Sequence, residues 1–159
     1  MTSELLFTGP ELCKFEAHEV VALLKAREIS SSDLIDAALT RIAQTGPLIN
    51  ATPTLCEARA RAVDLSSRDS TPAGWLAGLP ITIKDLNAVA DVRTTFGTKG
   101  LAGFIPQKSD PLVDQLEQRG AVILGKTNTP EFGAGGNTFN DVFGQTRNPW
   151  DTALNPGGS

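Results

Sequence analysis

The sequence predicts an α/β protein in which helices come first and the strands of a mixed sheet follow. Two observations support this class. Up to about residue 70, apolar side chains recur at helical spacing among charged ones. From Leu76 onward, short apolar runs such as LPITI and AVIL alternate with connections rich in glycine and proline, which is the pattern of strands.

Three helices are expected in the first part of the chain. Apolar residues between Leu12 and Leu24 predict an amphipathic helix over residues 10–28. A serine within residues 30–32 can cap a second helix, which Gly46-Pro47 should end. The spacing of apolar residues predicts a third helix over residues 54–67, and the polar segment SSRDSTPAG is expected to form a loop after it.

The composition narrows the class of protein. A hydrophobic content of 40% and a charged content of 20% are typical of a water-soluble globular chain. A net charge of -4 without a basic cluster argues against direct binding of nucleic acid. The first residues lack a basic leader and an unbroken apolar run, so the cytoplasm is the expected location. Cys13 and Cys56 lack a metal-binding spacing and are interpreted as small buried side chains, with a disulfide or a metal site as alternatives.

Residues 120–127, GAVILGKT, match the phosphate-loop pattern G-x-x-x-x-G-K-[ST]. The neighbouring residues indicate a different structure. Asp110 and Pro111 suit the start of a helix, and Gly120 stands where such a helix would end. The four residues that should form the loop, Ala-Val-Ile-Leu, are typical of a buried parallel strand. We therefore predict a helix end followed by a strand, and nucleotide binding is the alternative.

Polar and glycine-rich segments follow both predicted strands. LPITIKD runs a strand directly into Lys84, and the GKTN segment follows AVIL; ligand sites of α/β proteins lie at such strand ends. A desolvated lysine there can act as a base, whereas a surface lysine is the alternative. The glycines of EFGAGG and of NPGGS let the backbone come close to a ligand or adopt unusual geometry, although each segment could also be an ordinary loop or turn.

Taken in order, GLPITIKD, TTFGTKGLAGF, GAVILGKTNTPEF, FGQTRNPWD and NPGGS closely resemble the amidase signature family. The segment SSSDLIDAALTRIAQTGPLINA is similar to the family's usual lead-in. The resemblance implies an α/β/α layered domain around a mixed sheet, present here as its N-terminal helices and first strands. Residues 1–73 would be the helical lead-in, and residues 74–159 the start of the catalytic core, which stops inside the Gly-Gly-Ser motif.

The resemblance also implies an amide hydrolase with a Ser-Ser-Lys triad, without a metal or cofactor. Lys84 matches the family's base lysine. Ser159 matches the bridging serine, which the family holds through a non-proline cis peptide bond. The family's nucleophilic serine and oxyanion hole come after this position, so the chain of 159 residues is expected to be inactive by itself.

Further residues match parts of the family's substrate site and its surroundings. The loop that lines the acyl pocket is matched by Gly133, Ala134 and Gly135. Hydrogen bonds that fix the loops beside the base are expected from Asp85, Thr127 and Asn128.

The leading hypothesis is hydrolysis of a small carboxamide or anilide through an acyl-enzyme. The alternatives are the amidase-type subunit of a glutamyl-tRNA amidotransferase complex and an inactive truncated fragment. The expected partner is a small amide substrate, with neither a membrane nor a direct nucleic-acid contact. A homodimer, and a remainder of the domain supplied as a separate chain, stay open.

Overall fold

The computed structural model describes residues 7–66 and 73–158. Its helices are α1 (Ala17–Ala26), α2 (Ser31–Ile49), α3 (Glu57–Arg61) and α4 (Pro111–Gln118). Short 3-10 turns lie at Glu11–Lys14, Lys99–Leu101 and Glu131–Gly133. The strands are β1 (Thr54–Leu55), β2 (Pro80–Lys84), β3 (Val122–Thr127), β4 (Phe139–Asn140) and β5 (Gly144–Gln145). Helices followed by strands confirm the predicted fold class.

The main sheet has the strand order β1-β3-β2 and is mixed, as predicted. The central strand β3 pairs with β2 in parallel and with β1 in antiparallel orientation. On β3, Leu124 is one extra residue opposite the Ile81–Thr82 step of β2, which is a β-bulge. After the bulge, Ile83 pairs with Lys126 and Lys84 pairs with Thr127. This shift decides which side chains share a face at the end of the two strands.

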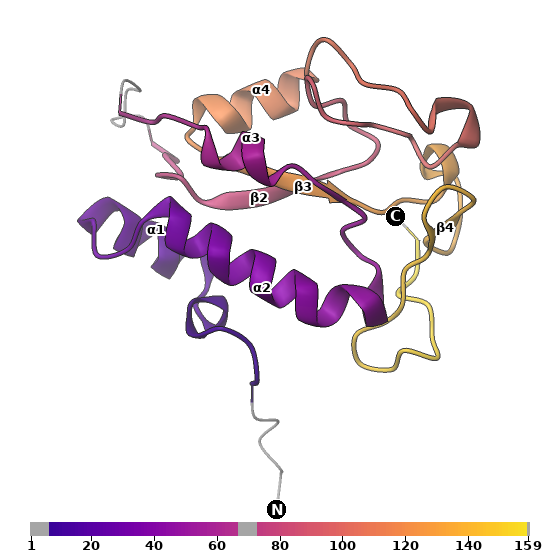
Figure 1. Cartoon of the computed structure of the whole chain (residues 1–159), viewed down its shortest axis with the longest axis horizontal. Coiled ribbons are helices and arrows are strands. Elements are labelled where there is room, and N and C mark those ends of the chain that lie inside the picture. The colour runs from indigo at the N-terminus through magenta and orange to yellow at the C-terminus, as the bar shows by residue number, and fades with distance from the viewer. Residues whose placement is uncertain (1–6, 67–72, 159) are drawn as a thin grey trace, which may run out of the picture.

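Helices pack on both faces of this sheet. In Figure 1, α2 lies below the strands and α4 lies above them. One core cluster joins Ile35 of α2 to Leu124 of β3, and the other joins Val113 of α4 to Ile83 and Ile123. The α3 helix is tied to both helices by ion pairs, Arg61 with Asp36 of α2 and Arg59 with Glu117 of α4. The layers therefore correspond to the predicted α/β/α arrangement.

Two of the expected helices have different ends. The helix predicted over residues 10–28 is a 3-10 turn followed by α1, with extended residues between them. The α2 helix begins after its Ser30 cap as predicted but passes through Gly46-Pro47, so the expected stop was wrong. Pro47 lies in the last turn, where Asn50 closes the helix in a left-handed conformation and donates its backbone N–H to the Gly46 carbonyl. The Asn50 side chain also donates to two carbonyls of the β5 region, which holds this turn in place.

The third expected helix was wrong at its start. Thr54 and Leu55 form β1, and the helix α3 covers only Glu57–Arg61. The end of the prediction reaches residue 67, which lies outside the described residues. The β1 pairing with β3 is the reason, because backbone hydrogen bonds to a distant strand replace those that a local helix would make.

The helix and strand predicted around GAVILGKT are confirmed. Asp110 and Pro111 start α4, and Gly120 follows its end with φ of 80°. The Gly120 N–H donates to the Glu117 carbonyl and the Ala121 N–H to the Leu116 carbonyl, which is a Schellman motif. Asp110 makes no side-chain cap; its carboxylate accepts from the Ala88 N–H instead. The strand β3 extends further than expected and includes Lys126 and Thr127.

Among the helices in the described part of the chain, none combines the length and the apolar character that crossing a membrane requires.

Candidate functional site

Lys84 is the last residue of β2, at the carboxyl end of the sheet, and is half-buried. The pairing with β3 continues one residue beyond it, because the Asp85 N–H donates to the Thr127 carbonyl at 3.0 Å. Neighbouring residues of a strand point to opposite faces. Ile83 packs in the core beneath α4, so the Lys84 side chain leaves the sheet on the other face. The structure therefore agrees with the strand-end position expected for Lys84.

Asp85, which follows Lys84 in the chain, forms a fully buried ion pair with Lys126. The distance between Asp85 Oδ1 and Lys126 Nζ is 3.1 Å. The Asp85 carboxylate also accepts from the Thr95 hydroxyl at 2.6 Å and from the Thr95 N–H at 3.0 Å. Lys126 Nζ donates to the Asn87 carbonyl at 2.7 Å and to the Thr94 hydroxyl at 2.8 Å. Burial lowers the pKa of Lys126, and the Asp85 carboxylate opposes that shift.

Asp85 thus makes hydrogen bonds that hold the segment after Lys84, as was expected of it. Sequence reasoning missed its partner, Lys126, which it placed at the end of a strand without a partner. A usable signal was present: a lysine between Gly125 and Thr127 in a strand with both faces covered must find an acceptor, and Asp85 follows the adjacent strand. The bulge at Leu124 turns Lys126 toward Asp85. No pattern in the sequence predicts this bulge.

Asn128 organises a second polar network beyond the end of β3. Its Oδ1 accepts from the Thr129 N–H and from Asn140 Nδ2, and its Nδ2 donates to the Thr146 hydroxyl at 3.0 Å. Asn140 Oδ1 in turn accepts from the N–H groups of Val142 and Phe143. These hydrogen bonds join the two ends of the segment 128–146, which contains the glycine-rich loop. Asn128 therefore has the supporting position that was expected, and Asn140 is a member that sequence reasoning missed.

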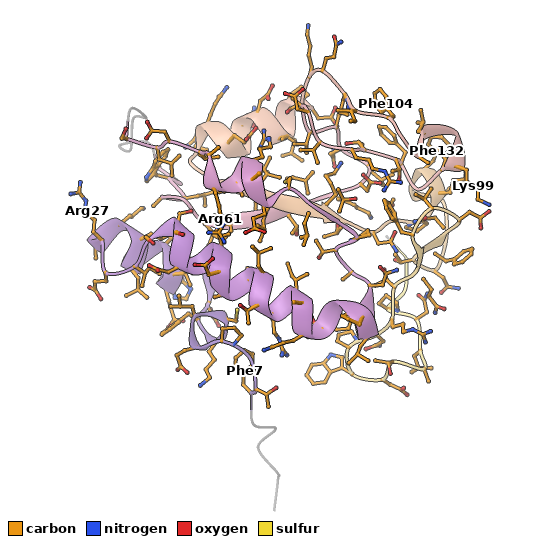
Figure 2. The ribbon with its side chains drawn as sticks, in the orientation of Figure 1. Phe7, Arg27, Arg61, Lys99, Phe104 and Phe132 are labelled. Atoms are coloured by element: carbon orange, nitrogen blue, oxygen red, sulfur yellow. The ribbon has the colours of Figure 1, made fainter. Side chains whose placement is uncertain are left out.

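Gly133 packs against the residues that follow Lys84. It has φ of 72°, and a Cβ there would come within 2.7 Å of the Leu86 side chain. Ala134 and Gly135 are exposed and help line an open hollow with Asn137 and Asn155. Phe132, whose N–H donates to the Phe96 carbonyl at 2.7 Å, lies with Phe104 at the same end of the molecule in Figure 2, far from Arg27.

The C-terminal residues reach the same loop. The Gly157 carbonyl accepts from the Thr138 N–H at 2.9 Å and from its hydroxyl at 2.8 Å. A side chain at Gly158 would overlap the Gly135 carbonyl oxygen, which explains the glycine. Ser159 itself lies outside the described residues. In Figure 1, this yellow segment lies at the side toward which the β3 arrow points.

The fold brings together three segments that the sequence predicted for the site: the turn after Lys84, the glycine-rich loop and the C-terminal glycines. The turn after Lys84 meets Gly133 through Leu86, and Gly158 meets Gly135. A lysine at a strand end, followed by a turn that packs against a loop of small residues, can serve proton transfer next to a bound ligand. Within residues 7–66 and 73–158, no group of three or more His, Cys, Asp or Glu residues lies together as metal ligands would.

Comparison with known proteins gave matches over most of the chain. The family model described as Amidase matches residues 33–159. A glutamyl-tRNA(Gln) amidotransferase subunit of Acidothermus cellulolyticus is 40% identical over 153 residues, which are 94% of this chain and 30% of that protein. The structure of 6-aminohexanoate cyclic dimer hydrolase complexed with substrate matches 91% of this chain and 30% of its own, with 31% identity and a TM-score of 0.81.

A bacterial aryl acylamidase of the amidase signature family also has a TM-score of 0.81, with 32% identity over 91% of this chain and 31% of its own. The chain spans about a third of the length of the relatives it matches. The family match covers most of the chain, and the solved structures share its fold over 91% of its length. The chain therefore belongs to the amidase family, the amidase signature enzymes.

Proposed function

We propose that the protein carrying this chain is an amidase that hydrolyses the carbon–nitrogen bond of a small carboxamide or anilide through an acyl-enzyme. The observation that carries the proposal is the contact of the turn after Lys84 and of Gly158 with one loop, residues 133–135, at the carboxyl end of the sheet. In this proposal, residues 74–159 are the first part of a longer catalytic core, and residues 1–73 are its helical lead-in. The expected location is the cytoplasm.

The proposed residues act as a proton relay. Lys84 Nζ, in its unprotonated form, accepts a proton from the Ser159 hydroxyl, which takes one from a nucleophilic serine later in the sequence. That serine attacks the amide carbon and forms a tetrahedral intermediate. Its collapse breaks the carbon–nitrogen bond, and the proton returns through the relay to the departing amine. Water then attacks the ester by the same route and releases the acid.

Binding of the acyl group is proposed for Gly133, Ala134 and Gly135. Ala134 and Gly135 are exposed in the hollow between this loop and Asn155, and their small side chains leave room for the substrate. The likeness to an aryl acylamidase supports an anilide, and the likeness to 6-aminohexanoate cyclic dimer hydrolase supports an aliphatic amide.

The test is to express the complete reading frame and measure turnover of a nitroanilide and of an aliphatic carboxamide. We expect Lys84→Ala and Ser159→Ala each to lower kcat/KM by about 10⁴-fold or more, as losing a relay member does elsewhere. Lys99→Ala is the matched control, because Lys99 is exposed and pairs with Asp141 at the surface. Mass spectrometry should detect the acyl group on a serine downstream of Ser159. An unchanged rate in Lys84→Ala, or a reading frame without a downstream Gly-Gly-Ser motif, would contradict the proposal.

The second candidate is the amidase-type subunit of a glutamyl-tRNA amidotransferase complex. It is favoured by the 40% identity with the glutamyl-tRNA(Gln) amidotransferase protein of Acidothermus cellulolyticus, which exceeds the identity with the amide hydrolases of known structure. The same relay would then release ammonia from glutamine for transfer to a charged tRNA held by other subunits.

Two measurements separate these candidates. Co-purification of the tagged complete protein with partner subunits, together with glutamine hydrolysis and no anilide turnover, would favour the amidotransferase. Anilide turnover by the protein alone would favour the amidase. Size-exclusion chromatography with light scattering decides between a monomer, a homodimer and a complex with a second chain.

A further inference from the structure

Lys126 has every hydrogen-bond donor of its ammonium occupied inside the protein. Three N–H groups meet three acceptors, Asp85 Oδ1 at 3.1 Å, the Asn87 carbonyl at 2.7 Å and the Thr94 hydroxyl at 2.8 Å. The residue is fully buried, so its charge is unavailable to a solvent-borne phosphate. The lysine of the GAVILGKT segment therefore binds acceptors of its own chain and not a phosphate.

Two of these acceptors belong to the turn that follows Lys84. The Lys84 carbonyl accepts from the Asn87 N–H at 3.0 Å, which closes the turn. Lys126 then holds the Asn87 carbonyl at one end of the turn and the Asp85 carboxylate at the other. The Lys84 side chain leaves on the opposite face, so the ammonium of Lys126 fixes its backbone without contacting it.

We propose that Lys126 is a positioning residue for Lys84, acting through Asp85 and Asn87. This proposal rests on the role of Lys84 as the base in the proposed function. A buried ion pair can often be replaced by apolar side chains without loss of stability, so stability alone does not account for the arrangement. A charged donor with three fixed acceptors supplies one defined geometry for the turn, and proton transfer is sensitive to displacements of about 1 Å.

The first test follows the turn by amide hydrogen exchange in the complete protein. Lys126→Met removes the ammonium and keeps an unbranched side chain, and the double variant Lys126→Met, Asp85→Asn also removes the unpaired carboxylate. The matched control is Val113→Ala, which opens a cavity in the core against Ile83 and leaves the Lys126 ammonium and its three acceptors in place. We expect Lys126→Met to raise exchange of the Asn87 amide on the order of tenfold more than exchange of amides in α2.

The double variant should regain thermal stability but keep the fast exchange at Asn87. The Val113→Ala variant should instead raise exchange at the turn and in α2 by similar factors. Equal effects of Val113→Ala and Lys126→Met on the two sites would overturn the proposal. So would a double variant in which the Asn87 amide regains full protection.

The second test uses the complete enzyme and separates kcat from KM. Lys126→Met and the double variant should lower kcat by about 10²-fold, with KM for a small anilide nearly unchanged, because the base and not the binding loop is displaced. A loss confined to KM, or an equal loss in Val113→Ala, would refute the positioning role. If the complete protein hydrolyses no amide, the proposed function fails, whereas the exchange experiment still decides whether Lys126 holds the turn.

Discussion

Replacing Lys126 by methionine should destabilise this protein far more than replacing any surface lysine. Among the described residues, the substitution leaves the Asp85 carboxylate, which is 0% exposed, with the Thr95 N–H and hydroxyl as its remaining donors. Leaving one member of a buried ion pair without its partner costs about 3–5 kcal/mol. In a chain of this size, 1 kcal/mol lowers Tm by about 2–4 °C, so we expect a fall of roughly 6–20 °C.

Thermal unfolding followed by circular dichroism, and urea unfolding at 25 °C, would measure this change. Lys99→Met is the control, because the Lys99–Asp141 pair is 71% and 62% exposed and should contribute at most about 1 kcal/mol. Adding Asp85→Asn to Lys126→Met should recover more than half of the lost free energy, since no buried charge is then left unpaired. A loss below about 1 kcal/mol in Lys126→Met, or no recovery in the double variant, would refute the reasoning.

Three further predictions concern other parts of the structure. Gly120→Ala should lower the free energy of unfolding by about 1–2 kcal/mol or more, because alanine is strained at φ of 80° and its Cβ would overlap the Trp75 ring. The control is Gly136→Ala, whose Cβ would meet no described atom within 4 Å and which should be nearly neutral in the same urea experiment. Isothermal titration should detect no saturable ATP binding, and binding that Lys126→Ala abolishes would restore the phosphate-loop interpretation. Burial raises the pKa of the Cys56 thiol above its usual value of 9.0, so the folded state keeps a proton that the unfolded state loses. The free energy of unfolding should therefore fall as pH rises above about 9, and this slope should be shallower in Cys56→Ala; equal slopes would contradict the assignment.

Local signals in the sequence determined much of the helical structure around the site. The Ser30 cap starts α2, Pro111 starts α4, and Gly120 ends it in a Schellman motif. Each of these features depends on hydrogen bonds or dihedral angles within a few residues, so the residue types alone predict them. The same holds for the buried strand in the phosphate-loop pattern, because an apolar, β-branched run cannot serve as a flexible loop.

Only the tertiary structure decided the remaining features. Thr54 and Leu55 form a strand because β3 offers them hydrogen bonds, and α2 continues past Pro47 because Asn50 finds acceptors near β5. The extra residue at Leu124 turns Lys126 toward Asp85, 41 positions earlier in the chain. The sequence by itself identified Lys84 as the candidate base. The turn after Lys84 is held by contacts between residues that are distant in the sequence. Those contacts form only once β2 and β3 are paired.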